Sequence, residues 1–209
     1  MFENITTIDL RIMSLYAKDY ARAYSIRAMT EELKINYPHT FKRVKLLLQR
    51  RILKAAKAGQ AHRISFNIHD TQAVQLLGFV EGLEAAQLKN ATLFLLAQEA
   101  SSVDPFCCVG LFGSRVSGKA TKTSDWDLFI ICQKEHQKEL SKLMSKFPQA
   151  STIQLQVFSA EEFRDSLYST EETVVKHIVR NKQIIHNPFP FYNLIREREK
   201  ITYAPSQTG

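Results

Sequence analysis

The sequence predicts a mixed α/β (α+β) protein in two parts, and three observations support this. The first 68 residues show three helical patterns followed by two short alternating stretches typical of a hairpin. From residue 106 onward, apolar strand-like stretches alternate with amphipathic helical ones. The charge divides in the same way, because residues 1–68 hold 13 Lys and Arg against 5 Asp and Glu, whereas residues 69–209 hold 15 against 16. We therefore expect a basic part that meets a polyanion and a near-neutral part with another task.

Composition and hydropathy exclude several classes of protein. Hydrophobic residues make up 44% and charged residues 23% of the chain, which is typical of globular proteins. The longest uncharged stretch, 147–160, has 14 residues, so we expect no membrane-spanning helix. No basic and then apolar block follows Met1, which predicts no signal peptide. The cysteines, an odd number with two adjacent in an apolar stretch, indicate buried thiols and a cytoplasmic location; they are Cys107, Cys108 and Cys132.

The first part contains three predicted helices. Residues 8–19 have an amphipathic pattern, and a second helix over 25–33 can be capped by Ser25. A third helix can begin at Pro38, with Thr40 also available as its cap. The residues of the third helix expected to face a core are Phe41, Val44, Leu47 and Leu48.

A short hairpin is predicted after these helices. Its two stretches are 52–57 and 62–67, with a break at Gly59. Three helices and a basic hairpin resemble the winged helix-turn-helix family over residues 1–68. The resemblance implies DNA binding, with one helix in the major groove and the hairpin on phosphate. The cations expected to bind DNA are Lys42, Arg43, Lys45, Arg50, Lys54, Lys57 and Arg63. The alternative is a module of this type that serves protein contacts or dimerisation.

A connecting segment is expected over 69–89. Residues 70–88 read as one helix, whose apolar stripe could also serve a homodimer. The stripe consists of Ala73, Leu76, Leu77, Val80 and Leu83. A further helix over 91–100 follows Asn90.

The segment most informative about chemistry is FCCVGLFGSRVSGKATKTSDWDLFIICQ, which starts at residue 106. An apolar strand over 106–112 ends at Gly113 and Ser114. Ten residues after Ser114, the run Ser-Asp-Trp-Asp begins at Ser124 and leads into a second strand over 128–132. The acids of this Asp-x-Asp pair are Asp125 and Asp127. On a strand, residues i and i+2 point to one face, so the two carboxylates project together. Such a pair repels unless a cation lies between its members, and oxygen ligands suit Mg²⁺ or Mn²⁺.

This motif resembles the polymerase-beta-type nucleotidyltransferase superfamily, especially its minimal stand-alone members. The resemblance implies transfer of a nucleoside monophosphate from a nucleoside triphosphate to an acceptor hydroxyl, with Mg²⁺ or Mn²⁺ as cofactor. It assigns catalysis and metal binding to Asp125 and Asp127. Nucleotide binding is expected of Gly113, Ser114, Arg115 and Lys119, because a glycine lets the backbone approach a phosphate and the cations add positive charge.

The rest of the chain keeps an alternating α/β pattern. Helices are predicted over 135–147, 161–168, 170–180 and 189–199, and strands over 152–158 and 184–185. The family's full catalytic set has a third carboxylate on a later strand, expected here within 152–158. That strand has Gln154 and Gln156 on its polar face, and an amide cannot act as a general base. The nearest acids that follow it are Glu161, Glu162 and Asp165.

The sequence therefore predicts a winged helix over 1–68, a connecting helix over 69–89, a nucleotidyltransferase domain with a small mixed sheet over 90–200, and a tail over 201–209. The leading function is nucleotidyl transfer on a chain that also binds DNA. The alternative is a DNA-binding regulator or antitoxin-like protein partner whose nucleotidyltransferase domain has weakened catalysis. The Asp-x-Asp pair favours the first function, and the missing carboxylate favours the second.

Overall fold

The structure, a computed structural model, describes residues 5–58, 61–148 and 150–202. It divides the chain into two compact units, unit 1 over Met1–Glu81 and unit 2 over Gly82–Gly209. The division falls inside helix α4 (Thr71–Ala85). This helix lies within the segment for which the sequence predicts a connecting role. Its apolar stripe is buried up to Val80, but Leu83 is exposed, so the expected stripe is one position shorter.

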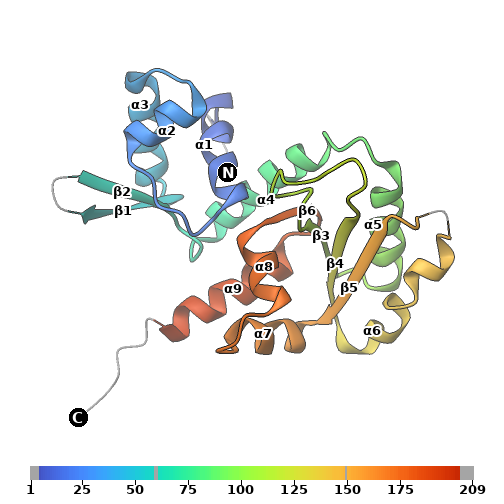
Figure 1. Cartoon of the computed structure of the whole chain (residues 1–209). Helices are drawn as coiled ribbons and strands as arrows, with labels where there is room; N and C mark the ends of the chain where they lie inside the picture. The colour runs from blue at the N-terminus through green and yellow to red at the C-terminus, as the bar shows by residue number, and fades with distance from the viewer. Residues whose placement is uncertain (1–4, 59–60, 149, 203–209) are drawn as a thin grey trace, which may run out of the picture. The chain divides into compact units, whose positions relative to one another are not determined.

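Unit 1 begins with three helices and a hairpin (Figure 1). They are α1 (Thr7–Lys18), α2 (Ile26–Leu33), α3 (Tyr37–Gln49), β1 (Leu53–Ala58) and β2 (Ala61–Phe66). The strands are antiparallel, and Leu53 pairs with Phe66 at the open end of the hairpin. The order of elements is the one expected from the sequence, while the winged-helix assignment stays a prediction. Gly59, the expected break, lies outside the described residues.

Side-chain caps explain where the helices of unit 1 begin. Ser25 caps α2 as expected, accepting a hydrogen bond from the Ala28 amide at 3.1 Å. The cap of α3 is Asn36, and the suggestion of Thr40 is wrong. Asn36 accepts from the His39 amide, and Thr40 is already one turn inside the helix, where its buried hydroxyl donates to the Asn36 carbonyl. Proline in the first turn suits this start, because its missing N–H would have no helical partner there.

The core of unit 1 joins the helices to the hairpin. Tyr16 on α1 is fully buried, and its hydroxyl donates to the Ile64 carbonyl on β2 at 2.9 Å. Val44 and Leu47 on α3 are buried as expected. Phe41 is not, because 46% of it is exposed and its ring stacks on Tyr37 with 6.0 Å between centroids. The outer face of α3 therefore carries aromatic rings as well as cations.

Unit 2 is built on a four-stranded mixed sheet. The strands are β3 (Cys108–Phe112), β4 (Trp126–Cys132), β5 (Ile153–Ser159) and β6 (Lys182–His186), in the spatial order β5-β4-β3-β6. β4 and β5 are parallel, and the other neighbours are antiparallel. The remaining elements are α5 (Ala91–Val103), α6 (Lys134–Leu140), the 3₁₀ helix η1 (Leu143–Lys146), α7 (Ala160–Tyr168), α8 (Val174–Arg180) and α9 (Phe189–Thr202). The mixed α/β class and the small mixed sheet expected from the sequence are confirmed.

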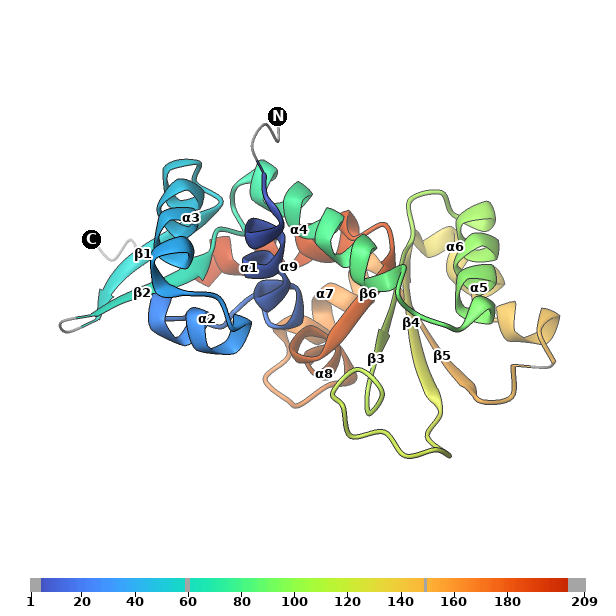
Figure 2. The same ribbon diagram turned by 90° about the horizontal axis from the view of Figure 1, so that it is seen from above.

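Helices cover both faces of this sheet. In Figures 1 and 2, α5 and α6 lie on one side of the strands, and α7, α8 and α9 lie on the other. The first layer packs apolar side chains such as Leu96 and Leu140 against Leu128 and Ile130 of β4. The second layer is aromatic, since Phe191 of α9 contacts the ring of Phe129 at 6.2 Å between centroids. All three cysteines are buried and none forms a disulfide, as expected.

Two helices of unit 2 are shorter than the sequence predicts. The pattern over 135–147 ends as an α-helix at Leu140, where Ser141 donates its hydroxyl back to the Gln137 carbonyl, and continues only as η1. The helix expected from residue 170 begins at Val174, because Thr173 caps it. In the described part of the chain, the helices lack the combined length and hydropathy that a membrane crossing requires.

Candidate active site

Two carboxylates lie at one end of the central strands of unit 2. Asp125 directly precedes β4, and Asp127 is its second residue. In the sheet, Asp127 pairs with Phe112 on β3 and with Gln154 on β5. Because side chains alternate along a strand, both acids share one face, while Trp126 packs against the apolar cluster on the other. The fold thus holds two acids side by side at an accessible sheet end.

Gly113 forms the close turn that faces these acids. Its φ of +77° lies in the left-handed region, where other residues are strained. A Cβ at this position would also overlap the Asp127 carboxylate. The turn is closed by the Ser117 amide, which donates to the Gly113 carbonyl at 3.0 Å, and by the Lys119 amide, which donates to the Ser114 carbonyl at 2.9 Å. Two separate constraints therefore require glycine beside Asp127.

Arg115 braces the loop and does not point freely toward a phosphate site. Its Nε donates to the Asp125 carbonyl at 3.2 Å, and its Nη2 donates to the Ser124 carbonyl. The guanidinium also lies over the Trp126 ring, 4.5 Å from the centroid. These contacts fix the backbone that carries Asp125. A sequence pattern does not reveal them, because they depend on how the loop folds back on itself.

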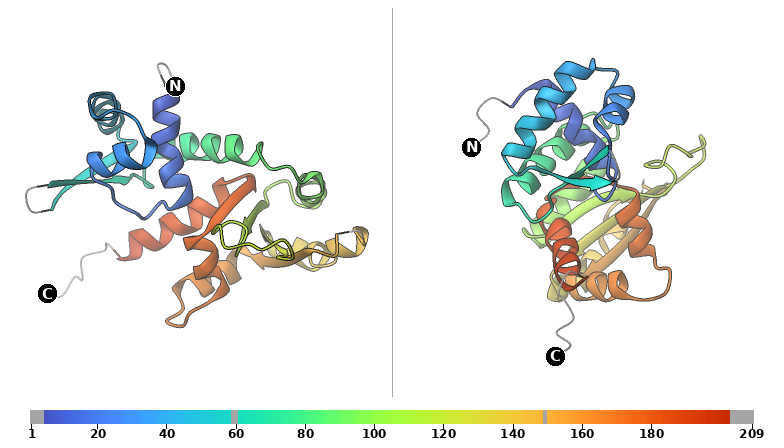
Figure 3. Two further views of the ribbon diagram at one scale, coloured as in Figure 1. Left: turned by 45° about the horizontal axis from the view of Figure 1, so that its top comes forward. Right: turned by 90° about the vertical axis from the view of Figure 1, so that its left-hand side faces the viewer.

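Ser114 and Lys119, the other residues expected to bind the nucleotide, lie in the same connection. Ser114 follows Gly113 and is half-buried, whereas the Lys119 side chain is exposed. In Figures 2 and 3, the yellow-green connection between β3 and β4 extends beyond the end of the sheet. Lys119 is therefore placed where a charged ligand could reach it from solvent.

The two acids differ in their electrostatic surroundings. Burial raises the pKa of Asp127 above its ordinary value, and the nearby negative charge of Asp125 raises this pKa further. Both effects disfavour a second negative charge at this end of the sheet. A bound cation would reverse them, so the arrangement favours a positively charged partner.

Gln154 is the third polar side chain of this cluster. It lies opposite Asp127 in the parallel β4–β5 pair, and its Nε2 donates to Asp125 Oδ2 at 2.8 Å. Gln156 lies opposite Phe129, two residues farther along the strand. The polar face predicted for this strand is therefore present, and Gln154 is the residue beside the acids.

The fold and this geometry agree with a comparison against protein-family models. Residues 96–188 match the family described as "Polymerase beta, Nucleotidyltransferase". Over these residues the chain is similar to a polymerase-beta-type nucleotidyltransferase domain. The match includes Gly113, both acids and Gln154.

The other two comparisons add little. A solved structure described as "Crystal structure of the toxin-antitoxin with AMP-PNP" has 17% sequence identity to this chain, and the match covers 55% of this chain and 90% of that one. Its TM-score is 0.33, which does not establish a shared fold. A search of curated proteins gives no match.

The acids of the nucleotidyltransferase domain form a donor set suited to a hard divalent cation. Both supply carboxylate oxygens, the ligands that Mg²⁺ and Mn²⁺ prefer. Within residues 5–58, 61–148 and 150–202, no three His, Cys, Asp or Glu side chains come together as metal ligands. A cation held by Asp125 and Asp127 would complete its shell with water and substrate oxygens.

The acids that follow β5 do not complete this set. Glu161 pairs with Lys134 at 3.0 Å, and Glu162 forms a capping box with Ser159 at the start of α7. Residue 160 lies six strand steps from Gln154, or about 20 Å at about 3.3 Å per residue. Asp165 lies on α7, which also starts at that far end. In the part of the chain that the structure describes, none of these three acids joins Asp125 and Asp127 in a group of metal ligands.

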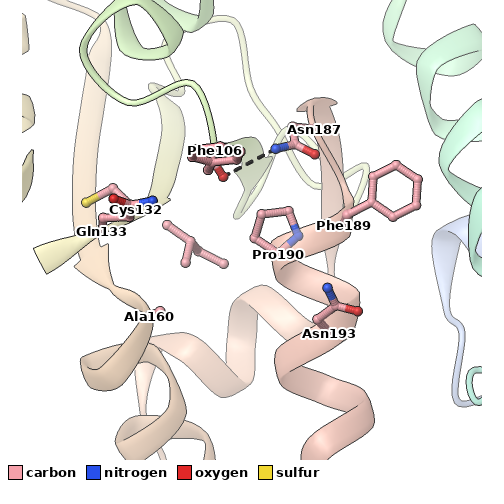
Figure 4. Close-up of a pocket in the computed structure, with 9 residues that line it drawn as sticks. Phe106, Cys132, Gln133, Ala160, Asn187, Phe189, Pro190 and Asn193 are labelled. Carbon is pink, nitrogen blue, oxygen red and sulfur yellow. Dashed lines mark hydrogen bonds between the residues drawn. The ribbon is translucent and has the colours of Figure 1, made fainter.

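A separate pocket of about 400 Å³ opens at that opposite end of the sheet (Figure 4). Cys132 and Gln133 line it where β4 ends, and Pro190 and Asn193 line it from α9. Asn187 donates its amide to the Phe106 carbonyl across the rim at 3.2 Å. This pocket is thus distinct from the acid cluster.

The cations proposed for DNA binding lie on α3, the hairpin and the turn between them. Most are exposed: Lys42, Lys45, Lys54, Lys57 and Arg63. Arg50 is half-buried at the end of α3. Arg43 differs, because its Nε donates to Asp9 Oδ1 at 2.8 Å and only 15% of its side chain is exposed. Because Arg43 is held in this ion pair, we remove it from the residues proposed to contact DNA.

Proposed function

We propose that this protein transfers a nucleoside monophosphate from a nucleoside triphosphate to an acceptor hydroxyl, with Mg²⁺ or Mn²⁺ held by Asp125 and Asp127. The observation that carries this proposal is the placement of both carboxylates on one side at the start of β4, with Asp127 directly against Gly113, in a segment that matches a polymerase-beta-type family model. A self-repelling acidic pair at the end of a sheet is costly for a fold. Its presence is explained if the pair holds a cation.

The residues of the site have distinct roles in this reaction. The acceptor oxygen attacks the α-phosphorus, the bond to the bridging oxygen breaks, and pyrophosphate leaves. The amides of the Gly113 turn and the Ser114 hydroxyl donate to triphosphate oxygens, and Lys119 adds a positive charge. Arg115 holds the Asp125 backbone in place. When bound, the divalent ion would offset the developing charge on the phosphate oxygens.

The acceptor proton has no obvious protein base in this arrangement. Gln154 occupies the position beside Asp127, and an amide cannot take a proton there. The proton would pass to water or to a phosphate oxygen. Because general-base catalysis contributes about 10²–10⁴-fold, we expect slow turnover.

A second candidate function follows from the same residue. Gln154 favours a DNA-binding regulator, or an antitoxin-like partner of another protein, whose nucleotidyltransferase domain has weakened catalysis. Turnover separates the two functions. A wild-type turnover rate of about 1 s⁻¹ or more is typical of enzymes. Such a rate would reject the hypothesis that this protein is a regulator with weakened catalysis, and it would also contradict our expectation of slow turnover.

DNA binding by unit 1 is part of the proposal. The exposed cations of α3 and the hairpin would contact phosphates, and the stacked Tyr37 and Phe41 rings would offer an apolar surface among them. The three buried cysteines form no disulfide, which supports a reducing compartment, and we therefore place the protein in the cytoplasm.

Calorimetry tests the metal site directly. Wild-type protein is titrated with ATP in the presence of Mg²⁺, and the double variant Asp125→Asn, Asp127→Asn is expected to bind at least tenfold more weakly. Asp165→Asn, which removes an exposed carboxylate of α7, serves as the matched control and should keep wild-type affinity. Equal affinity of the double variant and the wild type would reject the assignment of these acids.

A further inference from the structure

The amide of Gln154 lies at hydrogen-bond distance from the acid pair. Its Nε2 is 2.8 Å from Asp125 Oδ2. Adjacent ligands of an octahedral Mg²⁺ site, each 2.0–2.1 Å from the ion, lie about 2.9 Å apart. The amide thus lies at ligand spacing from the carboxylate, but the group that it turns toward Asp125 is its N–H, which cannot bind a cation.

Because the Gln154 amide is neutral, the negative charge that the protein supplies at this site comes from the two carboxylates. Two carboxylates carry two negative charges, which match one divalent ion. A pair of divalent ions brings four positive charges and needs further anionic ligands that bridge or flank them. In the part of the chain that the structure describes, no third acidic, histidine or cysteine side chain joins the pair.

We propose that Gln154 restricts this site to a single divalent ion per chain by occupying the third ligand position and holding Asp125 Oδ2 through its amide. The inference rests on the proposed function, because it assumes that Asp125 and Asp127 bind a cation. Gln154 acts as a positioning residue, since it orients a metal ligand without itself being one.

The number of bound Mn²⁺ ions tests this proposal. Electron paramagnetic resonance counts the free Mn²⁺ remaining when the full chain is titrated in the presence of a non-hydrolysable ATP analogue, with the ions bound to the analogue alone subtracted. Wild type is expected to bind one ion. Gln154→Glu keeps the side-chain length and places a carboxylate oxygen at ligand spacing, so this variant is expected to bind two.

Gln156→Glu is the matched control. It adds the same charge to the same exposed strand face, but two residues farther along and opposite Phe129, so it should still bind one ion. Gln154→Ala, which adds no charge, should also keep one ion but bind it more weakly, because Asp125 loses its orienting hydrogen bond. A merely structural role of Gln154 would change the melting temperature and leave these stoichiometries unchanged.

The outcomes separate this inference from the function on which it rests. Two ions on the wild-type protein would overturn the single-ion proposal while supporting a metal site. One ion on Gln154→Glu would show that Gln154 does not limit the site and would overturn its assigned role. No ion on the wild type would reject the proposed function itself.

Discussion

At the scale of single residues, two glycines of the same loop offer a direct test of the site. Gly113 and Gly118 both have left-handed φ values, of +77° and +74°. A Cβ at Gly113 would overlap Asp127, whereas a Cβ at Gly118 would meet nothing within 4 Å. A substitution would thus strain the backbone at both positions, but it would collide with the carboxylate only at Gly113.

We therefore expect Gly113→Ala to weaken Mn²⁺-dependent nucleotide binding at least tenfold. Gly118→Ala should destabilise the protein by about 1–2 kcal/mol through left-handed strain and leave that affinity unchanged. Calorimetry gives the affinities, and urea unfolding gives the stabilities. Equal affinities for the two variants would mean that the Gly113 turn does not shape the site.

Two buried thiols predict how stability depends on pH. Burial, followed by the charge of Asp104, raises the pKa of Cys107 and of Cys132 from 9.0 to about 12. Between these values the unfolded chain releases the thiol protons while the folded chain keeps them. The contribution to stability is therefore complete below pH 9 and is lost as the pH rises toward 12.

The expected result is a urea midpoint that falls between pH 8 and pH 10. Other groups titrate in this range, so the comparison is with the double variant Cys107→Ala, Cys132→Ala. This variant should be less stable at pH 8 because of lost packing, and its midpoint should fall less with pH. An identical fall in both proteins would show that the thiols do not cause it.

The sequence predicted some residues of the site better than others, for physical reasons. Gly113, Asp125 and Asp127 could be found because strand periodicity and turn chemistry are local properties. The bracing contacts of Arg115 could not, since they depend on the path of the thirteen-residue connection between β3 and β4. Gln154 was placed on the correct face by alternation, but only the parallel register of β4 and β5 brings it to Asp125.

At the scale of elements, α1 and α3 are joined by one ion pair. Asp9 is fully buried, forms a capping box with Thr6 at the start of α1, and accepts two hydrogen bonds from Arg43 on α3. Arg43 was expected to face solvent, and a buried partner 34 positions earlier is not visible in a helical pattern. This ion pair explains why Arg43, unlike the exposed lysines of α3, is largely buried.

Removing the arginine should be costly, because it leaves a buried carboxylate without its cation. We expect Arg43→Ala to destabilise unit 1 by about 3–5 kcal/mol, measured by urea unfolding of the full chain. Lys42→Ala, at the exposed neighbouring position, should change stability by no more than about 0.5 kcal/mol. Similar small effects of both substitutions would show that the ion pair is not a structural requirement.

Element boundaries followed the sequence where a cap is explicit in it. Ser25 and Asn90 begin α2 and α5 as expected. Other boundaries depend on competing hydrogen bonds, as where Ser141 ends α6 and Thr173 delays α8. Periodicity alone cannot identify these positions, because the apolar pattern continues across them.

At the scale of the whole molecule, the division of charge makes a quantitative prediction. The net charge of residues 1–68 is +8 from 13 basic and 5 acidic residues, and the remainder of the chain is near neutral. The proposed DNA surface contains five exposed cations. Since each neutralised phosphate contributes about 0.9, the slope of log affinity against log salt should be about −4.5.

Fluorescence anisotropy of the full chain on a labelled duplex measures this slope. The double variant Lys42→Ala, Lys45→Ala should reduce its magnitude by about 1.8. Lys138→Ala with Lys142→Ala, which removes two exposed lysines of unit 2, should leave it unchanged. If DNA binding did not respond to salt, or if no DNA binding occurred at low salt, the alternative that unit 1 serves protein contacts would be favoured.

The pairing of Phe112 with Asp127 has a consequence for how this protein can change over evolution or by engineering. The two strands meet at this pair, and the connection between them is anchored by Gly113 at one end and Asp125 at the other. Residues inserted at Lys119 to Thr123 would lengthen the connection without shifting the register of the sheet. By contrast, a one-residue slip of β5 would bring Ile153 or Leu155 beside Asp127 and turn Gln154 to the opposite face. Under the proposed function, grafted loops between β3 and β4 are therefore expected to change the acceptor, while the proposed metal ligands keep their positions.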